Sequence, residues 1–272
     1  MRIAVVTMDD PVVVNRFVGS VLRSKRESVV GVAVARGRGQ LSARRRRSDP
    51  RYAIALAVAA GIGPTLQALR RVLAARRARK AGSAPAGSDL CIDFEARALG
   101  IPVVEVESAN SPEAMAALAS WSPDVVVNQS QDIISAEVLR CARIGFLNRH
   151  NSLLPEYRGR LAPFWALYHG ERRIGVTIHF LAEGVDEGDI VVQRAIDLRP
   201  GEGFAVADAR CYEAAPSAML EALDRVSRGE RGRPMPRPLP APYKVPTIGQ
   251  AIRFRLGLRP REPRGRSPAL DP

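Results

Sequence analysis

The fold is decided by the stretch Phe146–Asp189, which reads FLNRHNSLLPEYRGRLAPFWALYHGERRIGVTIHFLAEGVDEGD. An apolar run, Ile144–Leu147, leads into it and ends at Asn148, as a buried strand does at the edge of a sheet. If the backbone stays extended through His150, alternation places the side chains of Asn148 and His150 on the same side. A second strand is predicted over Gly175–Ala182, which is rich in β-branched and aromatic residues.

The turn that follows this second strand, Glu183–Asp189, places Asp186 between Gly184 and Gly188. Glycine allows such a turn to adopt positive φ and to bring its backbone close to a ligand. An amide, an imidazole and a carboxylate form an acid/base site when they meet, because one donates to an oxyanion, one moves a proton and one orients the proton carrier. We therefore expect Asn148, His150 and Asp186 to converge.

The order of these motifs resembles the signature of the 10-formyltetrahydrofolate-dependent formyltransferases, a family that includes methionyl-tRNA and sugar-amine formyltransferases. The motifs are Asn-x-His, Ser-Leu-Leu-Pro-x-Tyr-Arg-Gly, Gly-Val-Thr and Asp-x-Gly-Asp, and they lie within Asp124–Leu198. The offset of 36 positions between His150 and Asp186 (186 − 150) also matches the family pattern. The resemblance implies that Asn148, His150 and Asp186 are the catalytic residues and that 10-formyltetrahydrofolate is the co-substrate, with no metal required.

The resemblance also implies where the folate binds. A strand is predicted over Asp124–Asn128, and the loop after it would form the wall of the pterin pocket. In the loop after His150, Tyr157 and Arg158 are candidate substrate-binding residues, with packing as the alternative. Ordinary packing is likewise the alternative for the two isoleucines of the pterin loop. The implied cofactor-binding residues are Gln131, Asp132, Ile133, Ile134 and Leu139.

The beginning of the chain predicts a β-α-β unit. Strands are expected over Arg2–Thr7 and Val29–Ala35, with a helix over Val12–Leu22 between them. This order is typical of an α/β, doubly wound, mostly parallel, Rossmann-like sheet. No Gly-x-Gly-x-x-Gly follows the first strand, so the dinucleotide fingerprint is absent. The glycine-serine phosphate loop of glycinamide ribonucleotide formyltransferases is absent too, which argues against that substrate.

We predict a catalytic domain over residues 1–200 with a helical insertion at about 36–88, a helical C-terminal appendage over 201–258 and a disordered tail over 259–272. The insertion has a basic linker, an apolar stretch at Tyr52–Leu69 and a basic stretch at Arg70–Lys80. We favour a helical insertion that packs on the core. The alternatives are an interfacial helix on anionic lipid and an unspecific contact with nucleic acid. The apolar stretch is short for a membrane span of about 20 uninterrupted residues.

The net charge of the 272-residue chain is +13, which would suit nucleic acid, anionic lipid or a phosphorylated substrate. Arginine carries the excess, and a bias in the source genome explains such an excess equally well, so it identifies no partner. Three widely spaced cysteines suit a reducing cytoplasm. No signal peptide precedes the first predicted strand. We expect a cytoplasmic protein, with peripheral membrane association through 52–80 as an alternative; nothing in the sequence indicates an oligomeric state.

The expected activity is formyl transfer to the primary amine of a small substrate, either a sugar amine or an amino-acid amine. The family's methionyl-tRNA formyltransferases carry an additional C-terminal β-barrel, whereas 74 residues follow Leu198 in this chain (272 − 198). A nucleic-acid partner is therefore disfavoured but stays open. Two alternatives remain, a methionyl-tRNA formyltransferase and a non-catalytic, membrane-peripheral binding module.

Overall fold

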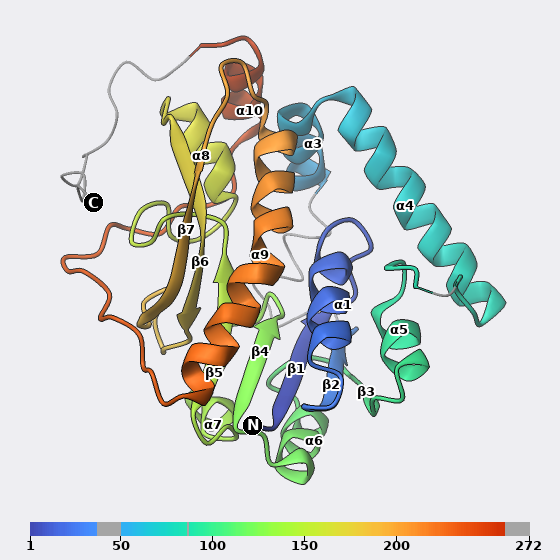
Figure 1. Cartoon of the computed structure of the whole chain (residues 1–272). Helices are drawn as coiled ribbons and strands as arrows, with labels where there is room; N and C mark the ends of the chain where they lie inside the picture. The colour runs from blue at the N-terminus through green and yellow to red at the C-terminus, as the bar shows by residue number, and fades with distance from the viewer. Residues whose placement is uncertain (37–49, 86, 259–272) are drawn as a thin grey trace.

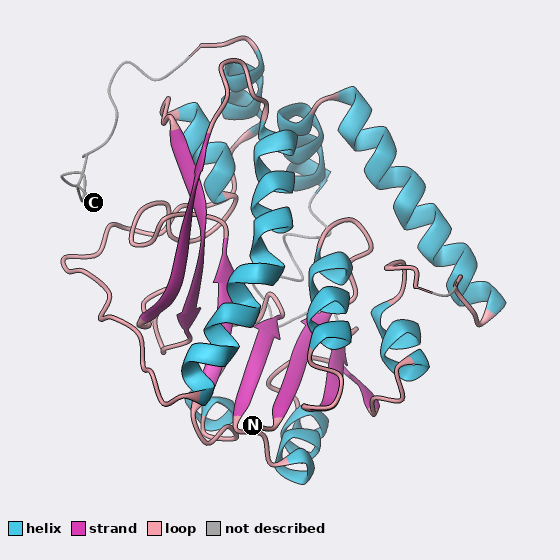
Figure 2. Cartoon of the chain, viewed as in Figure 1, coloured by secondary structure: helices cyan, strands magenta, loops and turns pink. Residues whose placement is uncertain are grey.

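The computed structural model describes residues 1–36, 50–85 and 87–258. A seven-stranded sheet lies at its centre, with the strand order β3-β2-β1-β4-β5-β6-β7 (Figures 1 and 2). Neighbouring strands are parallel from β3 to β5, and β6 and β7 add two antiparallel pairings. This sheet confirms the predicted fold class. The strands are β1 (Ile3–Met8), β2 (Val29–Ala35), β3 (Val103–Val106), β4 (Val125–Gln129), β5 (Gly145–His150), β6 (Arg173–Phe180) and β7 (Ile190–Asp197).

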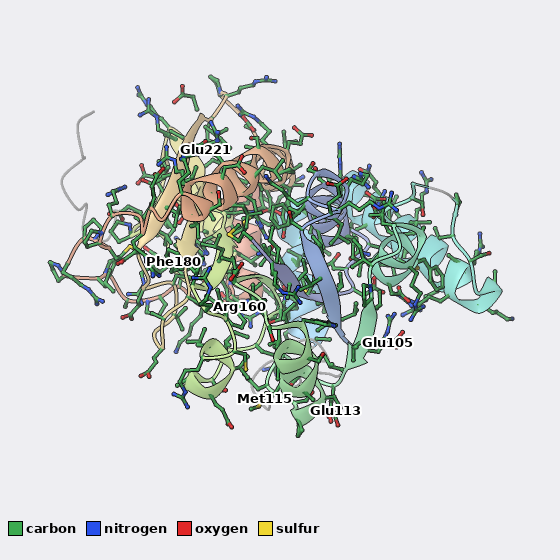
Figure 3. The ribbon with its side chains drawn as sticks, turned by 60° about the horizontal axis from the view of Figure 1, so that its bottom comes forward. Glu105, Glu113, Met115, Arg160, Phe180 and Glu221 are labelled. Carbon is green, nitrogen blue, oxygen red and sulfur yellow. The ribbon has the colours of Figure 1, made fainter. Side chains whose placement is uncertain are left out.

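Helices cover both faces of the sheet, so the strands read as nearly continuous apolar runs. In β1, the side chains of Ile3 and Val5 face α1 (Val14–Ser24), α5 (Ile92–Ala98) and α9 (Phe204–Ser227). Ala4 and Val6, by alternation, face α6 (Pro112–Trp121) and α7 (Ala136–Leu139). Figure 3 shows these two layers on opposite sides, marked by Glu221 of α9 and Glu113 of α6. Two separate apolar cores therefore fix the sheet.

Local signals set several helix boundaries. The Ser111 side chain accepts a hydrogen bond from the N–H of Ala114, and Pro112 occupies the first turn of α6. A serine at the N-cap followed by a proline in the first turn is a favourable start for a helix. In α9, Pro216 does not divide the element, which runs as one helix of 24 residues. This helix packs on β6, β7 and α1, and the domain boundary placed at residue 200 stays a prediction.

The predicted insertion forms two helices, α3 (Pro50–Ala60) and α4 (Ile62–Ala81). Ala55 and Ala59 of α3 pack against α8 (Ala162–Tyr168) and α10 (Ile248–Arg255) in a cluster rich in aromatic side chains. Ala75 and Ala78 of α4 pack near Cys91. The segment is thus helical and packs on neighbouring elements, while its status as an insertion and its bounds at about 36–88 stay a prediction. Most of the basic linker, and the tail predicted over 259–272, lie outside the described residues.

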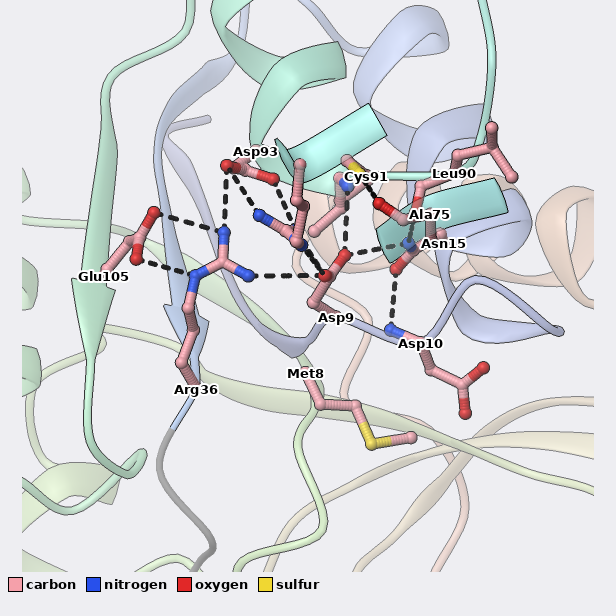
Figure 4. Close-up of polar contacts among 12 residues, drawn as sticks. Met8, Asp9, Asp10, Asn15, Arg36, Ala75, Leu90, Cys91, Asp93 and Glu105 are labelled. Carbon is pink, nitrogen blue, oxygen red and sulfur yellow. Dashed lines mark hydrogen bonds and ion pairs between the residues drawn. The ribbon is translucent and has the colours of Figure 1, made fainter. Parts of the chain in front are cut away.

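A group of ion pairs fastens α4 to the ends of β1 and β2 (Figure 4). We call it the insertion ion cluster. Arg79 of α4 contacts Asp9, which follows β1, and its Nη2 lies 2.9 Å from Asp93 Oδ1. Arg36, which follows β2, lies 2.9 Å from Asp93 and 2.7 Å from Glu105. The insertion is thus joined to the sheet by charge as well as by packing.

The outer edge of the sheet is partly covered at β7. The backbone N–H of Ile190 donates to the carbonyl of Arg233, and the N–H of Arg233 donates back to the carbonyl of Ile190, both at 2.8 Å.

None of the helices in the described ranges combines the length and apolar character that a membrane crossing requires.

Candidate active site

Two neighbouring strands carry most of the candidate site. Asn148 and His150 lie on β5, which continues past the predicted end of the apolar run. The antiparallel pairing with β6 places His179 opposite Asn148 and Thr177 opposite His150. Directly paired residues in an antiparallel ladder share a face. The imidazole of His179 is therefore brought next to the amide of Asn148.

Asp186 reaches the same place from the turn between β6 and β7. Its Oδ2 lies 3.5 Å from Nδ1 of His150, and its Oδ1 lies 3.6 Å from Nε2 of His179. The backbone N–H of Gly159 donates to Oδ2 at 2.9 Å. The backbone of Asp186 has φ of +51°, a left-handed conformation that a short polar side chain tolerates. We call Asn148, His150, His179 and Asp186 the amide–histidine site.

The hydrogen bonds of His150 determine its free nitrogen. Nε2 lies 2.9 Å from the carbonyl oxygen of Tyr157. Because a carbonyl only accepts, Nε2 carries the hydrogen and donates it. In the neutral ring, Nδ1 then carries no hydrogen, and its lone pair faces Asp186. A proton taken up at Nδ1 would lie beside that carboxylate.

His179 is also fixed in one tautomer. It is fully buried, and its Nδ1 lies 2.8 Å from the carbonyl oxygen of Phe180, so Nδ1 donates and Nε2 accepts. The Nδ2 of Asn148 lies 3.4 Å from Nε2 and supplies the hydrogen. Burial lowers the pKa of His179 to about 4, with Asp186 opposing the shift. His179 is therefore neutral near pH 7.

Asp186 is held as a carboxylate. Burial raises its pKa, but His150, the Gly159 N–H and Arg158 together outweigh burial and hold the pKa below its ordinary value. The site thus has one fixed negative charge beside an imidazole that can become positive. A carboxylate beside an imidazole is an arrangement suited to general acid–base chemistry.

The loop after β5 supports the site with backbone groups and with Arg158. This guanidinium is 4% exposed, donates to the carbonyls of Val185 and Pro240, and pairs with Glu187. It therefore clamps the turn that carries Asp186. The ring of Tyr157 stacks on His169 and Tyr243. The predicted substrate-binding roles of Tyr157 and Arg158 stay predictions.

The loop after β4 is ordered by its own polar contacts. Asp132 Oδ2 accepts from the Ala109 N–H at 2.8 Å, and Asn110 donates to the Ile133 carbonyl at 2.8 Å. Ile133 is 66% exposed, as an apolar wall for a flat pterin requires, whereas Ile134 is buried. These features fit a folate donor. Of the other predicted folate residues, Leu139 is the last residue of α7 and packs against the apolar core on that face of the sheet. Gln131 accepts a hydrogen bond from Arg160, which Figure 3 labels.

Three contributors were not among the predicted site residues. The sequence favours a satisfied sheet histidine at His179, and the structure shows that its partners belong to the site. Gln129 Nε2 donates to Asn148 Oδ1 at 3.3 Å, and Arg149 Nε donates to Gln129 Oε1 at 3.0 Å. The signal that finds His179 is the register of β5 against β6, which no local pattern provides.

Fold and site together define an α/β protein with an amide, two imidazoles and a carboxylate at the carboxyl end of its central strands. The formyl transferase family model matches residues 1–223. The chain therefore belongs to the formyl transferase family, and the resemblance drawn from the sequence is confirmed. This membership supports the predicted formyl-transferring activity and the folate donor.

Relatives of known sequence agree with this family. The chain is 36% identical over 132 residues to a methionyl-tRNA formyltransferase of Chlorobium chlorochromatii (strain CaD3). The matched region covers 48% of this chain and 42% of the relative. It is 35% identical over 152 residues to a methionyl-tRNA formyltransferase of Anaeromyxobacter sp. (strain K), with coverages of 56% and 49%. The chain thus spans about half the length of the curated relatives it matches.

Solved structures share the fold at lower identity. Glycinamide ribonucleotide transformylase 1 of Symbiobacterium toebii superposes with a TM-score of 0.58 at 19% identity, covering 87% of this chain and 94% of that one. Phosphoribosylglycinamide formyltransferase of Bacillus halodurans gives a TM-score of 0.58 at 16% identity, with coverages of 85% and 97%. At these identities the likeness shows the common architecture.

Proposed function

We propose that this protein transfers a formyl group from 10-formyltetrahydrofolate to the primary amine of a small molecule, a sugar amine or an amino-acid amine. The observation that carries the proposal is the convergence of Asn148, His150 and Asp186, with 3.5 Å between His150 Nδ1 and Asp186 Oδ2, inside the region that matches the family. The folate supplies the formyl group as an N-formyl amide.

Each residue of the site has a distinct role in this proposal. The Asn148 amide donates to the formyl oxygen as negative charge grows there. Nδ1 of His150 takes the proton that the attacking amine loses, and it can return that proton to the departing nitrogen, so the proton balance closes. Asp186 stabilises the imidazolium and keeps the ring in place. Ile133 and the backbone of residues 131–134 would hold the pterin.

A second acceptor is favoured by the relatives. The two relatives reported above are named methionyl-tRNA formyltransferases and are 35–36% identical to this chain over the matched region. The net charge of +13 would also aid binding to tRNA. Methionyl-tRNA is therefore the second candidate acceptor. Contact by charge alone would weaken steeply as salt is added.

One panel of acceptors tests both candidates. Purified protein is mixed with 10-formyltetrahydrofolate and, separately, with a free sugar amine, a nucleotide-linked sugar amine, ornithine and methionyl-tRNA, and released tetrahydrofolate is measured. A reaction without acceptor corrects for hydrolysis, and His150→Ala corrects for uncatalysed transfer. Release above both controls with a sugar amine or ornithine supports the proposal, whereas release with methionyl-tRNA alone supports the second candidate acceptor. If every acceptor gives only background release, the proposal is wrong.

We also propose that the protein is cytoplasmic. A peripheral membrane contact through residues 52–80 is a further part of this proposal. Co-sedimentation with phosphatidylserine vesicles tests the contact. Binding that disappears when Arg76 and Arg77 are both changed to Ser would support it, since both arginines are exposed on α4. An unbound wild-type protein would exclude it.

A further inference from the structure

A line of hydrogen bonds reaches Asn148 from the opposite face of the sheet. Arg149 follows Asn148 on β5, so its side chain points toward α1 and α9. Its guanidinium carbon lies 4.0 Å from the ring centre of Tyr212 and 5.5 Å from that of Phe17. From there, Nε donates to Gln129 Oε1 at 3.0 Å. The guanidinium thus lies near two aromatic rings and directs its Nε–H at the amide oxygen of Gln129.

Gln129, at the end of β4, connects Arg149 to Asn148 in the site through hydrogen bonds. It is the last residue of that strand and is 5% exposed. Its Nε2 donates to the neighbouring carbonyl of Asn128 and, at 3.3 Å, to Oδ1 of Asn148. All hydrogen-bonding atoms of this amide are therefore engaged, and its oxygen faces Arg149 while its nitrogen faces Asn148.

The direction of these bonds is fixed at both ends. A guanidinium only donates, so it requires the oxygen of Gln129 on its side. A reversed Gln129 would place an N–H group against that guanidinium. At the other end, the carbonyl of Phe180 makes Nε2 of His179 an acceptor, which requires the nitrogen of Asn148 on its side. The Asn148 amide therefore has one permitted orientation, with one N–H on His179 and the other available.

Arg149 is itself held from behind. Its Nη1 donates to Oδ1 of Asn151, and Nδ2 of Asn151 donates to Oδ1 of Asp208 at 2.9 Å. Asp208 lies on α9, so the line joins that helix to the end of β5. A carboxylate, which only accepts when ionised, again sets the direction of the neighbouring amide.

We infer that Gln129 and Arg149 are positioning residues that orient the Asn148 amide so that its free N–H points at the formyl oxygen. An amide turned by 180° would present its oxygen to that oxygen and oppose the developing charge instead of stabilising it. This inference rests on the proposed function. It adds to that function the hydrogen bonds, from Arg149 through Gln129, that orient the oxyanion donor Asn148. Asp208 and Asn151 fix Arg149 in turn.

A competing role for Arg149 is direct binding of an anionic acceptor. The two roles differ in kinetics. A positioning residue acts on the transition state, so its loss lowers kcat and leaves the KM of the acceptor nearly unchanged. A residue that binds the acceptor equally in ground and transition states raises KM and leaves kcat unchanged.

The first experiment measures the orientation of the amide without turnover. The chain has three histidines, so ¹⁵N-histidine NMR resolves the titration of His179. In Gln129→Glu the side chain still accepts from Arg149 but cannot donate to Asn148, which turns the Asn148 oxygen toward His179 and favours the protonated ring. We expect the pKa of His179 to rise by about one unit or more from its value of about 4. Gln129→Met removes the donor without adding charge and should give a smaller rise.

The chain offers a matched control in Gln193. Its Oε1 accepts from Arg233 at 2.9 Å, and its Nε2 donates to the Leu154 carbonyl at 2.9 Å, so an arginine orients this amide too. Its line does not lead to Asn148. Gln193→Glu should lower thermal stability and leave the titration of His179 where it is in the wild type.

The second experiment measures kinetics with the acceptor that the panel identifies. We expect Gln129→Glu to lower kcat by about 10- to 100-fold and Gln129→Met by less, with both KM values within about twofold of the wild type. In the Asn148→Ala background, Gln129→Glu should have no further effect, because the residue acts through an amide that is gone. Full additivity of the two effects would overturn the inference.

The outcomes separate the inference from the proposed function. Wild-type turnover together with normal kcat and an unmoved His179 in Gln129→Glu overturns the inference and leaves the function standing. A rise in acceptor KM alone in Arg149→Lys reassigns Arg149 to acceptor binding. Absence of wild-type turnover overturns the function, and the NMR titration still decides whether Gln129 orients Asn148.

Discussion

The insertion ion cluster and the amide–histidine site both place carboxylates near the carboxyl ends of strands, but their partners differ. In the ion cluster, Asp9 and Asp93 face the guanidinium groups of Arg79 and Arg36, which stay charged at every accessible pH. In the amide–histidine site, Asp186 faces two imidazoles. Only the second arrangement can gain and lose a proton near neutrality.

This difference explains why one cluster holds structure and the other can carry chemistry. Burial raises the pKa of Asp93, yet the bonds from Arg79 and the charge of Arg36 outweigh it and hold the pKa below its ordinary value. Its charge is therefore permanent near pH 7, as is that of its partners. At Asp186 the carboxylate is equally permanent, but the charge of its partner is not. Of these two clusters, the amide–histidine site is therefore the one that contains groups suited to proton transfer.

The largest expected effect comes from removing the mobile proton. His150→Ala should lower kcat for formyl transfer by about 100-fold or more, because general acid–base catalysis is lost. Steady-state release of tetrahydrofolate measures it. Turnover close to the wild-type value would remove His150 from the mechanism, and an unchanged thermal midpoint would show that the loss is chemical.

A second prediction concerns the neutral histidine of the site. His179 has a pKa of about 4 when folded and an ordinary value of 6.5 when unfolded. The unfolded chain therefore binds a proton first, so stability is complete above pH 6.5 and decreases as the pH falls toward 4. The lowered pKa corresponds to roughly 3 kcal/mol over this range. Urea unfolding at a series of pH values should show a shallower decrease in His179→Gln and the full decrease in His169→Gln.

A third prediction tests the ion cluster as a purely structural unit. Arg79→Met leaves the buried Asp93 with fewer partners and should lower the free energy of unfolding by about 2 kcal/mol at pH 7, while kcat stays within about twofold. Because the pKa of Asp93 is lowered on folding, its contribution is complete above the ordinary value of 3.8 and is lost as the pH falls below it. The difference between variant and wild type should therefore narrow in acid.

The exposed margin of the same cluster gives the smallest effect. The side chain of Glu105 is 46% exposed, so Glu105→Gln should cost about 0.5 kcal/mol or less. Denaturation with urea measures both variants in one series. If Glu105→Gln lowered the free energy of unfolding as much as Arg79→Met does, the contribution of an ion pair in this cluster would not depend on its burial.

Much of this molecule follows from local sequence. The apolar run Arg2–Thr7 predicts a buried parallel strand, which the structure has at Ile3–Met8, and Ser111 before Pro112 is a local signal for the start of a helix. The ordered motifs predict that Asn148, His150 and Asp186 converge, and their catalytic roles stay a proposal. These signals depend on neighbours in the chain, or on a pattern that a family shares.

The remaining features depend on contacts that no local pattern encodes. Asp9 and Arg79 are 70 positions apart, and their pairing requires α4 to fold back across the end of β1. His179 joins the site because of the register between β5 and β6. Gln129 and Arg149 meet only because β4 and β5 are neighbours in the sheet. Long-range register, not residue type, decides these roles.

The aromatic cluster that joins the insertion to the body gives the molecule a built-in optical probe. Of the two tryptophans, Trp121 lies on α6, while Trp165 packs on Tyr243 and donates its Nε1–H to the Lys244 carbonyl at 2.9 Å. In a Trp121→Phe protein, fluorescence would come from Trp165 alone. A red shift of its emission would then report undocking of α3 and α10, separately from melting of the sheet.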